Sequence, residues 1–300
     1  MKILIIGSEG FIGSHFVSHF LNSANTVLTG LDLFEQPSRN YQYIKVSRLS
    51  PEFEEIFEQN SFDAVVNAAG SGNVPYSMSH PLSDFEANCL DTIRVLDVIR
   101  KHQPGCKYIH LSSAAVYGNP KQLPVREEDE ARPMSPYGWH KLVSEKLCLE
   151  YTSVYNIRTA VIRPFSVYGK GLKKQLFWDL HLKSRSGLAK VELFGTGKES
   201  RDFIHVEDMV KAVGLIIREG ELEGECYNIA SGIECTIEEA VSVFFQATGK
   251  KIDFAFNGKV REGDPLNWRA DISKLTALGF SPSIDLRTGL KGVAKWMQSI

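Results

Sequence analysis

The sequence predicts an α/β protein with a Rossmann-type doubly wound parallel sheet and a smaller mixed α/β domain towards the C-terminal end. Apolar strands alternate with helical segments over the first 165 residues, a pattern typical of a sheet covered by helices on both faces. The first strand runs directly into a glycine-punctuated turn and a helix. After residue 165 the alternation loosens. We therefore expect domains at 1–165 and 166–300, with parts of 203–230 returning to the first.

The elements of the first domain follow from apolar runs and their punctuation. KILIIG (2–7) is a β-branched apolar run that ends in glycine, which predicts a buried strand. A helix from Phe11 to Leu21 and a strand over TVLTGLDL (26–33) come next. PEFEEIFEQ (51–59) predicts a short helix, and FDAVVNAAG (62–70) predicts another buried strand.

The pattern continues with a long helix over residues 81–102, which begins at a proline. KYIHLSS (107–113) and IRTAVIRP (157–164) predict two more strands, with a helix that starts near Tyr137 between them. In the second domain, residues 195–209 are polar and rich in turn residues. Short helices are predicted at 206–218, 236–247 and 285–298.

Composition excludes several classes of protein. The chain has 300 residues, a net charge of −2 and no basic block, so nucleic acid is not an expected partner. It has no apolar run of about 20 residues, so we expect no membrane span. Five cysteines without a CxxC pair fit reduced thiols, and we expect a cytoplasmic protein. The eight histidines show no metal-ligand spacing, so no metal is expected.

The first turn carries the spacing of a dinucleotide-binding loop. Gly7, Gly10 and Gly13 follow the first strand and open a helix. Glycines let the backbone approach a pyrophosphate at a helix N-terminus. Asp32 lies at the end of the second strand, where a carboxylate accepts hydrogen bonds from ribose hydroxyls and repels a 2′-phosphate. The pattern therefore favours NAD over NADP.

A tyrosine and a lysine share one helical face in SPYGWHKLVSEK (135–146). Tyr-x-x-x-Lys occurs three times, but only Tyr137 and Lys141 stand in a helical pattern, after a first-turn proline. A lysine ammonium roughly 6 Å from the phenol is worth about 2.8 kcal/mol at an effective dielectric of 20, or about two pKa units. Together with a nicotinamide cation, Lys141 would bring Tyr137 towards a neutral pKa. We expect His140 to lie on the helix surface without a role.

Six motifs in order extend the pattern over nearly the whole chain. They are GSEGFIG (7–13), NAAG (67–70), SSAAVYG (112–118), SPYGWHK (135–141), RPFSVYG (163–169) and SRDFIHVEDM (200–209). With these motifs the chain resembles the extended short-chain dehydrogenase/reductase family. Within that family it is similar to the nucleotide-sugar epimerase/dehydratase branch, to which the UDP-glucose 4-epimerases belong.

The resemblance implies a role for each matching residue. Tyr137 would be the general acid/base, Lys141 would hold the nicotinamide ribose, and Ser113 would hydrogen-bond the sugar hydroxyl. The implied NAD-binding residues are Gly7, Gly10, Phe11, Ile12, Gly13, Asp32, Ala68, Ala69, Asn88 and Lys141. The implied substrate-binding residues are Ser113, Ser166, Arg201 and Arg261. Ser166 replaces an asparagine of the family pattern. The family also implies a homodimer formed by the helices at 81–102 and 137–155.

Three functions stay open at this point. A nucleotide-sugar 4-epimerase that keeps its NAD is favoured by Asp32 and by SSAAVYG (112–118). A 4-keto-6-deoxy nucleotide-sugar reductase would use the same Ser113, Tyr137 and Lys141 but consume NAD(P)H. A catalytically silent NAD-binding sensor would not need all three residues. Sugar dehydration is disfavoured, because Ala114 and Ala115 stand where the 4,6-dehydratases carry Asp-Glu.

Overall fold

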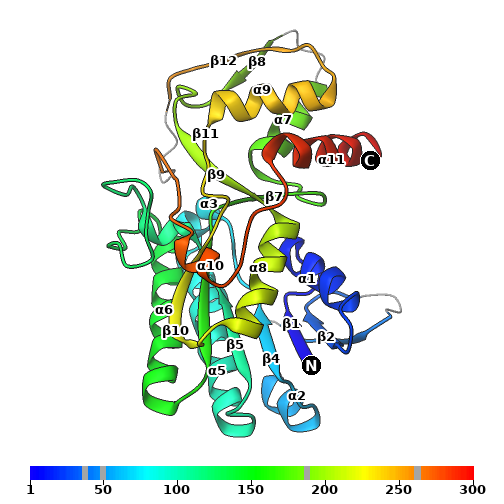
Figure 1. Ribbon diagram of the computed structural model, residues 1–300, viewed down its shortest axis with the longest axis vertical. Coiled ribbons are helices and arrows are strands. Elements are labelled where there is room, and N and C mark those ends of the chain that lie inside the picture. The colour runs from blue at the N-terminus through cyan, green and yellow to red at the C-terminus, as the bar shows by residue number, and fades with distance from the viewer. Residues whose placement is uncertain (36–39, 48–51, 186–189, 260–264) are drawn as a thin grey trace.

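The larger lobe of the protein is a seven-stranded sheet in which every neighbouring pair of strands is parallel (Figure 1). The computed structural model describes residues 1–35, 40–47, 52–185, 190–259 and 265–300. The strand order is β10-β6-β5-β4-β1-β2-β3. The strands are β1 (Lys2–Ile6), β2 (Val27–Asp32), β3 (Gln42–Lys45), β4 (Ala64–Asn67), β5 (Lys107–Leu111), β6 (Thr159–Pro164) and β10 (Glu223–Ile229). The predicted α/β class is confirmed, because this order contains the 3-2-1-4-5-6 arrangement of dinucleotide-binding sheets.

Helices cover both faces of this sheet. On one face, α1 (Phe11–Leu21) and α8 (Val206–Glu219) bury their apolar side chains against the strands. On the other face, α2 (Phe53–Gln59), α5 (Asp91–His102) and α6 (Pro136–Tyr155) do the same. Because water reaches neither face, strands such as β1 and β4 are continuous apolar runs, which is why the sequence pattern located them.

The helix predicted over residues 81–102 is present as one helical run with a wider turn in its middle. Its parts are α4 (Pro81–Phe85), a π-helical turn (Glu86–Leu90) and α5. Before it lies α3 (Val74–Ser79), which the sequence did not predict. Turns of this kind are often found at functional sites.

The smaller lobe packs two small sheets against helices. The strands β11 (Glu234–Thr236), β9 (Ser200–His205) and β7 (Ser166–Tyr168) form one sheet. A second pair joins β8 (Lys190–Leu193) to β12 (Asp253–Phe256). The helices of this lobe are α7 (Gln175–Arg185), α9 (Ile237–Thr248) and α11 (Leu286–Gln298), whereas the short α10 (Ser273–Ala277) packs against β10 of the larger sheet (Figure 1). The helices predicted at 206–218, 236–247 and 285–298 are therefore confirmed as α8, α9 and α11.

The prediction that residues 195–209 are rich in turns is wrong for residues 200–205, which form strand β9. The carboxylate of Asp202 is fully buried and accepts hydrogen bonds from the backbone N–H groups of Ser231, Gly232 and Ala270. A buried polar side chain can be satisfied by backbone donors. A strand that contains one lacks the continuous apolar run by which buried strands are recognised in a sequence. Within the described residues, no helix combines the length and apolar character that crossing a membrane requires.

Candidate active site

The glycine-rich segment 7–13, which joins β1 to α1 and includes the start of α1, has two positions that admit no side chain. A Cβ atom at Gly13 would lie 1.9 Å from the carbonyl oxygen of Gly7, and one at Gly7 would lie 2.8 Å from the amide nitrogen of Ala69. Gly7 also has a φ of +80°, a conformation that favours glycine. The loop therefore lies tightly against the end of β4, and α1 begins directly after Gly10.

A cavity of about 250 Å³ lies beside this loop and brings most of the predicted NAD-binding residues together. Of those residues, its lining includes Gly10, Phe11, Ile12, Gly13, Ala68, Ala69 and Lys141. Asp32 ends β2 next to the loop, where its carboxylate accepts hydrogen bonds from the backbone N–H groups of Glu9 (2.8 Å) and Leu33 (2.7 Å). A carboxylate has about four acceptor positions, so these two bonds leave capacity for ribose hydroxyls.

Tyr137 and Lys141 project from the first two turns of α6. The helix is capped by Ser135, whose Oγ accepts the N–H of Gly138 at 3.2 Å, with Pro136 in the first turn. A Cβ at Gly138 would lie 2.8 Å from the carbonyl oxygen of Ala115, so the helix packs closely on the turn after Ser113. Lys141 is buried, donates from Nζ to the carbonyl oxygen of Leu111 at 2.8 Å, and lies 6.0 Å from the Tyr137 ring centre.

The pKa of Tyr137 is raised in the protein without NAD, whereas the expectation was that Lys141 and a nicotinamide cation together lower it. Burial is the main cause, a hydrogen bond with Ser113 opposes it, and the charge of Asp84 adds to it. Burial also lowers the pKa of Lys141 from 10.5 to about 8. The expectation considered only the attraction between charges, whereas burial of both groups acts in the opposite direction. A further positive charge is therefore needed for Tyr137 to act as a base near neutral pH.

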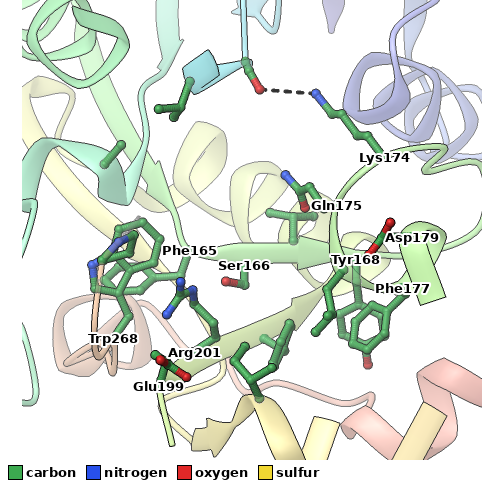
Figure 2. A pocket seen from close by; sticks show the side chains of 18 of the residues that line it. Phe165, Ser166, Tyr168, Lys174, Gln175, Phe177, Asp179, Glu199, Arg201 and Trp268 are labelled. Atoms are coloured by element: carbon green, nitrogen blue, oxygen red, sulfur yellow. Dashed lines mark hydrogen bonds between the residues drawn. The ribbon is translucent and has the colours of Figure 1, made fainter. Parts of the chain in front are cut away.

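A second cavity, of about 650 Å³, lies between the two lobes (Figure 2). Ser166 on β7 and Arg201 on β9 both line it. The Arg201 guanidinium lies 5.7 Å from the Trp268 ring centre and donates to the carbonyl oxygens of Ser200 and Leu266. Ser113 and Tyr137 line this cavity and the smaller one. The predicted acid/base residue therefore lies where the two cavities meet.

Two polar side chains at this junction were not predicted. Lys174 and Gln175, at the start of α7, line both cavities. Lys174 donates from Nζ to the carbonyl oxygen of Gly72 at 3.4 Å, and burial lowers its pKa (Figure 2). The segment 170–182 contains three lysines and one glutamine, and no motif in the sequence selects one of them.

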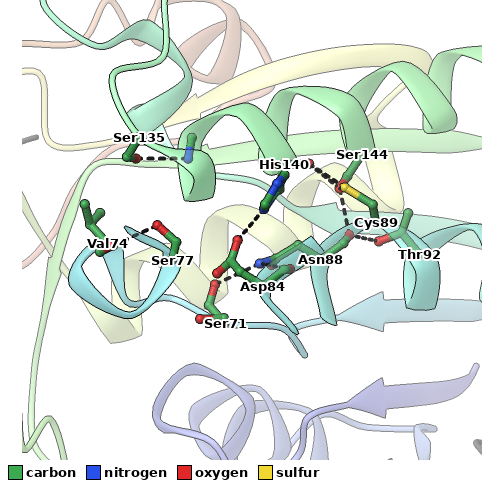
Figure 3. A network of polar contacts seen from close by, with 11 residues as sticks. Ser71, Val74, Ser77, Asp84, Asn88, Cys89, Thr92, Ser135, His140 and Ser144 are labelled. Carbon is green, nitrogen blue, oxygen red and sulfur yellow. Dashed lines mark hydrogen bonds and ion pairs between the residues drawn. The ribbon is translucent and has the colours of Figure 1, made fainter. Parts of the chain in front are cut away.

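The outcomes for Asn88, His140 and Arg261 differ from what the sequence predicted or cannot be placed among the described residues. Asn88 lies buried in the π-helical turn, donates to the carbonyl oxygens of Ser71 and Asp84, and is not among the described residues that line either cavity (Figure 3). The expectation that His140 is an idle surface residue is wrong, because its ring contacts the buried Asp84 carboxylate. Arg261 lies outside the described residues.

The doubly wound sheet, the glycine loop and the Ser113–Tyr137–Lys141 arrangement define an extended short-chain dehydrogenase/reductase. More specifically, the chain belongs to the NAD dependent epimerase/dehydratase family, whose model matches residues 3–230. NAD is the cofactor of this family, in agreement with the sequence.

Relatives named for two different activities align with nearly the full chain. The chain is 31% identical over 309 residues to a putative UDP-glucose 4-epimerase of Methanocaldococcus jannaschii, and the alignment covers 99% of this chain and 98% of the relative. It is 26% identical to the dTDP-glucose 4,6-dehydratase of Streptomyces niveus, covering 99% and 92%. Among solved structures, the UDP-glucuronic acid 4-epimerase from Bacillus cereus, in complex with UDP-glucuronic acid and NAD, matches with a TM-score of 0.90 at 27% identity, covering 100% and 99%. Choosing between the activities therefore depends on the site.

Proposed function

We propose that the protein is an NAD-dependent nucleotide-sugar 4-epimerase. The observation that carries this proposal is the position of Ser113 and Tyr137, which line both the cavity at the glycine loop and the larger cavity that holds Arg201. A 4-epimerase needs one acid/base that reaches a sugar hydroxyl and lies beside a nicotinamide ring. Ala114 and Ala115 provide no carboxylic acid for eliminating water, which sets the site apart from that of the 4,6-dehydratases.

Each residue of the site then has a chemical task. Ser113 would hydrogen-bond the C4 hydroxyl, and Tyr137 would remove its proton and later return it to the C4 oxygen of the epimerised sugar. Lys141 would hold the ribose next to the ring. Bound NAD would supply the hydride acceptor and donor, and the positive charge that favours an ionised Tyr137. Because burial raises the pKa of Tyr137, we expect proton removal to depend on that charge.

We further propose that the larger cavity binds a uridine diphosphate sugar. Two of the three named relatives are named for UDP sugars, and Arg201 offers a guanidinium suited to a diphosphate, with Ser166 beside it in the lining. In this proposal residues 1–165, with part of 203–230, bind NAD, and residues 166–300 bind the nucleotide sugar. We also retain the expectation of a homodimer formed through the helices at 81–102 and 137–155.

The test begins with the freshly purified protein. Denaturation should release NAD in a near-stoichiometric amount, measured by chromatography and mass spectrometry. Proton NMR should then show UDP-glucose, UDP-N-acetylglucosamine or UDP-glucuronic acid converted to its 4-epimer without added cofactor. Tyr137→Phe should abolish this conversion, whereas Tyr155→Phe, at the far end of the same helix, should not. A protein that requires NADPH in every turnover would instead be the 4-keto reductase.

A further inference from the structure

A buried carboxylate lies beneath the helix that carries Tyr137 and Lys141. The Asp84 side chain, on α4, is 0% exposed, and its Oδ2 accepts a hydrogen bond from Nδ1 of His140 on α6 at 2.6 Å (Figure 3). The His140 side chain is 15% exposed, and its ring meets the ring of Phe85 edge-on at 5.4 Å. The other carboxylate oxygen of Asp84 has no hydrogen-bond partner among the described residues.

Further hydrogen bonds join these two helical segments around the Asp84–His140 pair. Cys89 donates from Sγ to the carbonyl oxygen of His140 at 3.2 Å. The wider π-helical turn leaves the carbonyl oxygen of Asn88 open to the hydroxyls of Thr92 (2.8 Å) and Ser144 (2.7 Å). A buried carboxylate with one unsatisfied oxygen costs stability, so packing alone gives no reason for Asp84 at this position.

Asp84 is, among the described residues, the carboxylate near Lys141 that is bonded to an imidazole ring and not to a guanidinium. The titratable groups that act on Lys141 from the elements around it are Asp84 of α4, Cys89 of the π-helical turn, His110 of β5, and Glu145 and Cys148 of α6. Burial raises the pKa of both thiols and holds that of His110 well below its usual value, so these three groups are uncharged near neutral pH. Glu145 is bonded by two nitrogens of Arg163, at 2.9 and 2.7 Å.

The charge of Asp84 acts on both proposed catalytic groups in the same direction. Burial lowers the pKa of Lys141 to about 8, and Asp84 is the strongest influence opposing that change. Asp84 also adds to the raised pKa of Tyr137. His140 stands three residues after Tyr137 and directly before Lys141 on α6. It thus links the carboxylate to the helical turn that both side chains share.

We propose that Asp84 and His140 are a positioning pair, in which His140 holds the Asp84 carboxylate under α6 and the charge of Asp84 sets the pH range in which Tyr137 and Lys141 can work. The inference rests on the proposed function, because it takes these two residues as the acid/base and its partner. Asp84 touches neither substrate nor cofactor in this proposal and acts through α6.

The first test is the pH profile of kcat/KM for Asp84→Asn, which removes the charge and keeps the size. Both limbs of the bell-shaped profile should move to lower pH by about one unit, the low end of the shift that a nearby charge produces. Asp84→Ser is a second variant without the charge and should give the same displacement. The matched control is Asp97→Asn, on α5, where the aspartate forms a partly exposed pair with Arg100. A lower maximum with both limbs unmoved would overturn the proposal.

The second test does not need activity. Because the pKa of Lys141 is about 8 in the folded protein and 10.5 as an ordinary lysine, the unfolded chain binds the proton more tightly between these values. Unfolding free energy linked to Lys141 therefore rises as pH increases from about 8 to 10.5. In urea titrations, the unfolding free energy of Asp84→Asn should begin to rise at a lower pH than that of the unchanged protein. When Lys141→Met is present in both proteins, this difference between them should disappear. His140→Gln and Asp84→Asn should also be non-additive in unfolding free energy.

The two tests separate the inference from the function on which it rests. If no UDP sugar is epimerised but the Lys141-linked rise still moves with Asp84→Asn, the proposed function is wrong and the electrostatic pair stands. If epimerisation occurs but Asp84→Asn moves neither the limbs nor the linked rise, the pair is wrong. Additive effects of the His140 and Asp84 substitutions would likewise contradict it.

Discussion

Replacing Gly13 by alanine tests the cofactor site through two opposing effects. Within α1, alanine is favoured over glycine by about 1 kcal/mol. The new Cβ, however, would lie 1.9 Å from the carbonyl oxygen of Gly7 and 2.8 Å from its carbonyl carbon. Relieving that overlap requires the loop to move by about 1 Å, and a displacement of that size can cost about 100-fold in a positioned site, or about 2.8 kcal/mol. The clash outweighs the helix propensity.

We therefore expect Gly13→Ala to weaken NAD binding about 100-fold, measured by calorimetry on protein stripped of its nucleotide. Gly10→Ala is the matched control, because a Cβ there would lie 3.3 Å from the same carbonyl oxygen and needs only a small adjustment. Circular dichroism would establish that both variants are folded. Equal NAD affinities for the two variants would refute the reasoning.

Three other substitutions test separate parts of the molecule. Glu145→Gln should lower the unfolding free energy by about 3–5 kcal/mol in urea titrations, because it leaves Arg163 buried without its carboxylate; a change near zero would contradict this. Arg201→Met should raise KM for the nucleotide sugar and leave NAD affinity unchanged in calorimetry, and an unchanged KM would remove Arg201 from the substrate site. Val143→Glu, on a 39% exposed apolar position of α6, should convert a dimer of twice 33.6 kDa to the monomer in light scattering; a wild-type monomer would contradict the expected assembly.

The sequence was sufficient for the features that depend on local pattern. The strands β1, β4, β5 and β6 are apolar because both faces of the sheet are covered, so their runs are visible without a structure. The glycine loop was also visible, because close backbone approach requires glycine at fixed spacing. Strand β9 was hidden by Asp202, which is buried through backbone donors on distant segments.

Features that depend on packing between distant segments could not be predicted in the same way. Lys174 reaches the junction of the cavities because the start of α7 lies near Gly72 of the other lobe, which no local pattern encodes. His140 looked exposed because its burial depends on α4, whose Asp84 lies 56 residues earlier in the chain. The effect of burial on the Tyr137 pKa could not be predicted for the same reason, since desolvation depends on what surrounds the phenol.

The burial of the Lys141 ammonium destabilises the protein without NAD and would be partly compensated when NAD binds. Lowering its pKa from 10.5 to about 8 means that keeping the ammonium charged costs the folded protein about 3 kcal/mol below pH 8. Its hydrogen bond to Leu111 uses one of three donors, and the carboxylates that act on it, Asp84 and Glu145, are bonded to His140 and Arg163. A lysine kept only for stability would have a carboxylate of its own. Ribose hydroxyls would supply acceptors for the remaining donors, so part of that cost should be recovered when NAD binds.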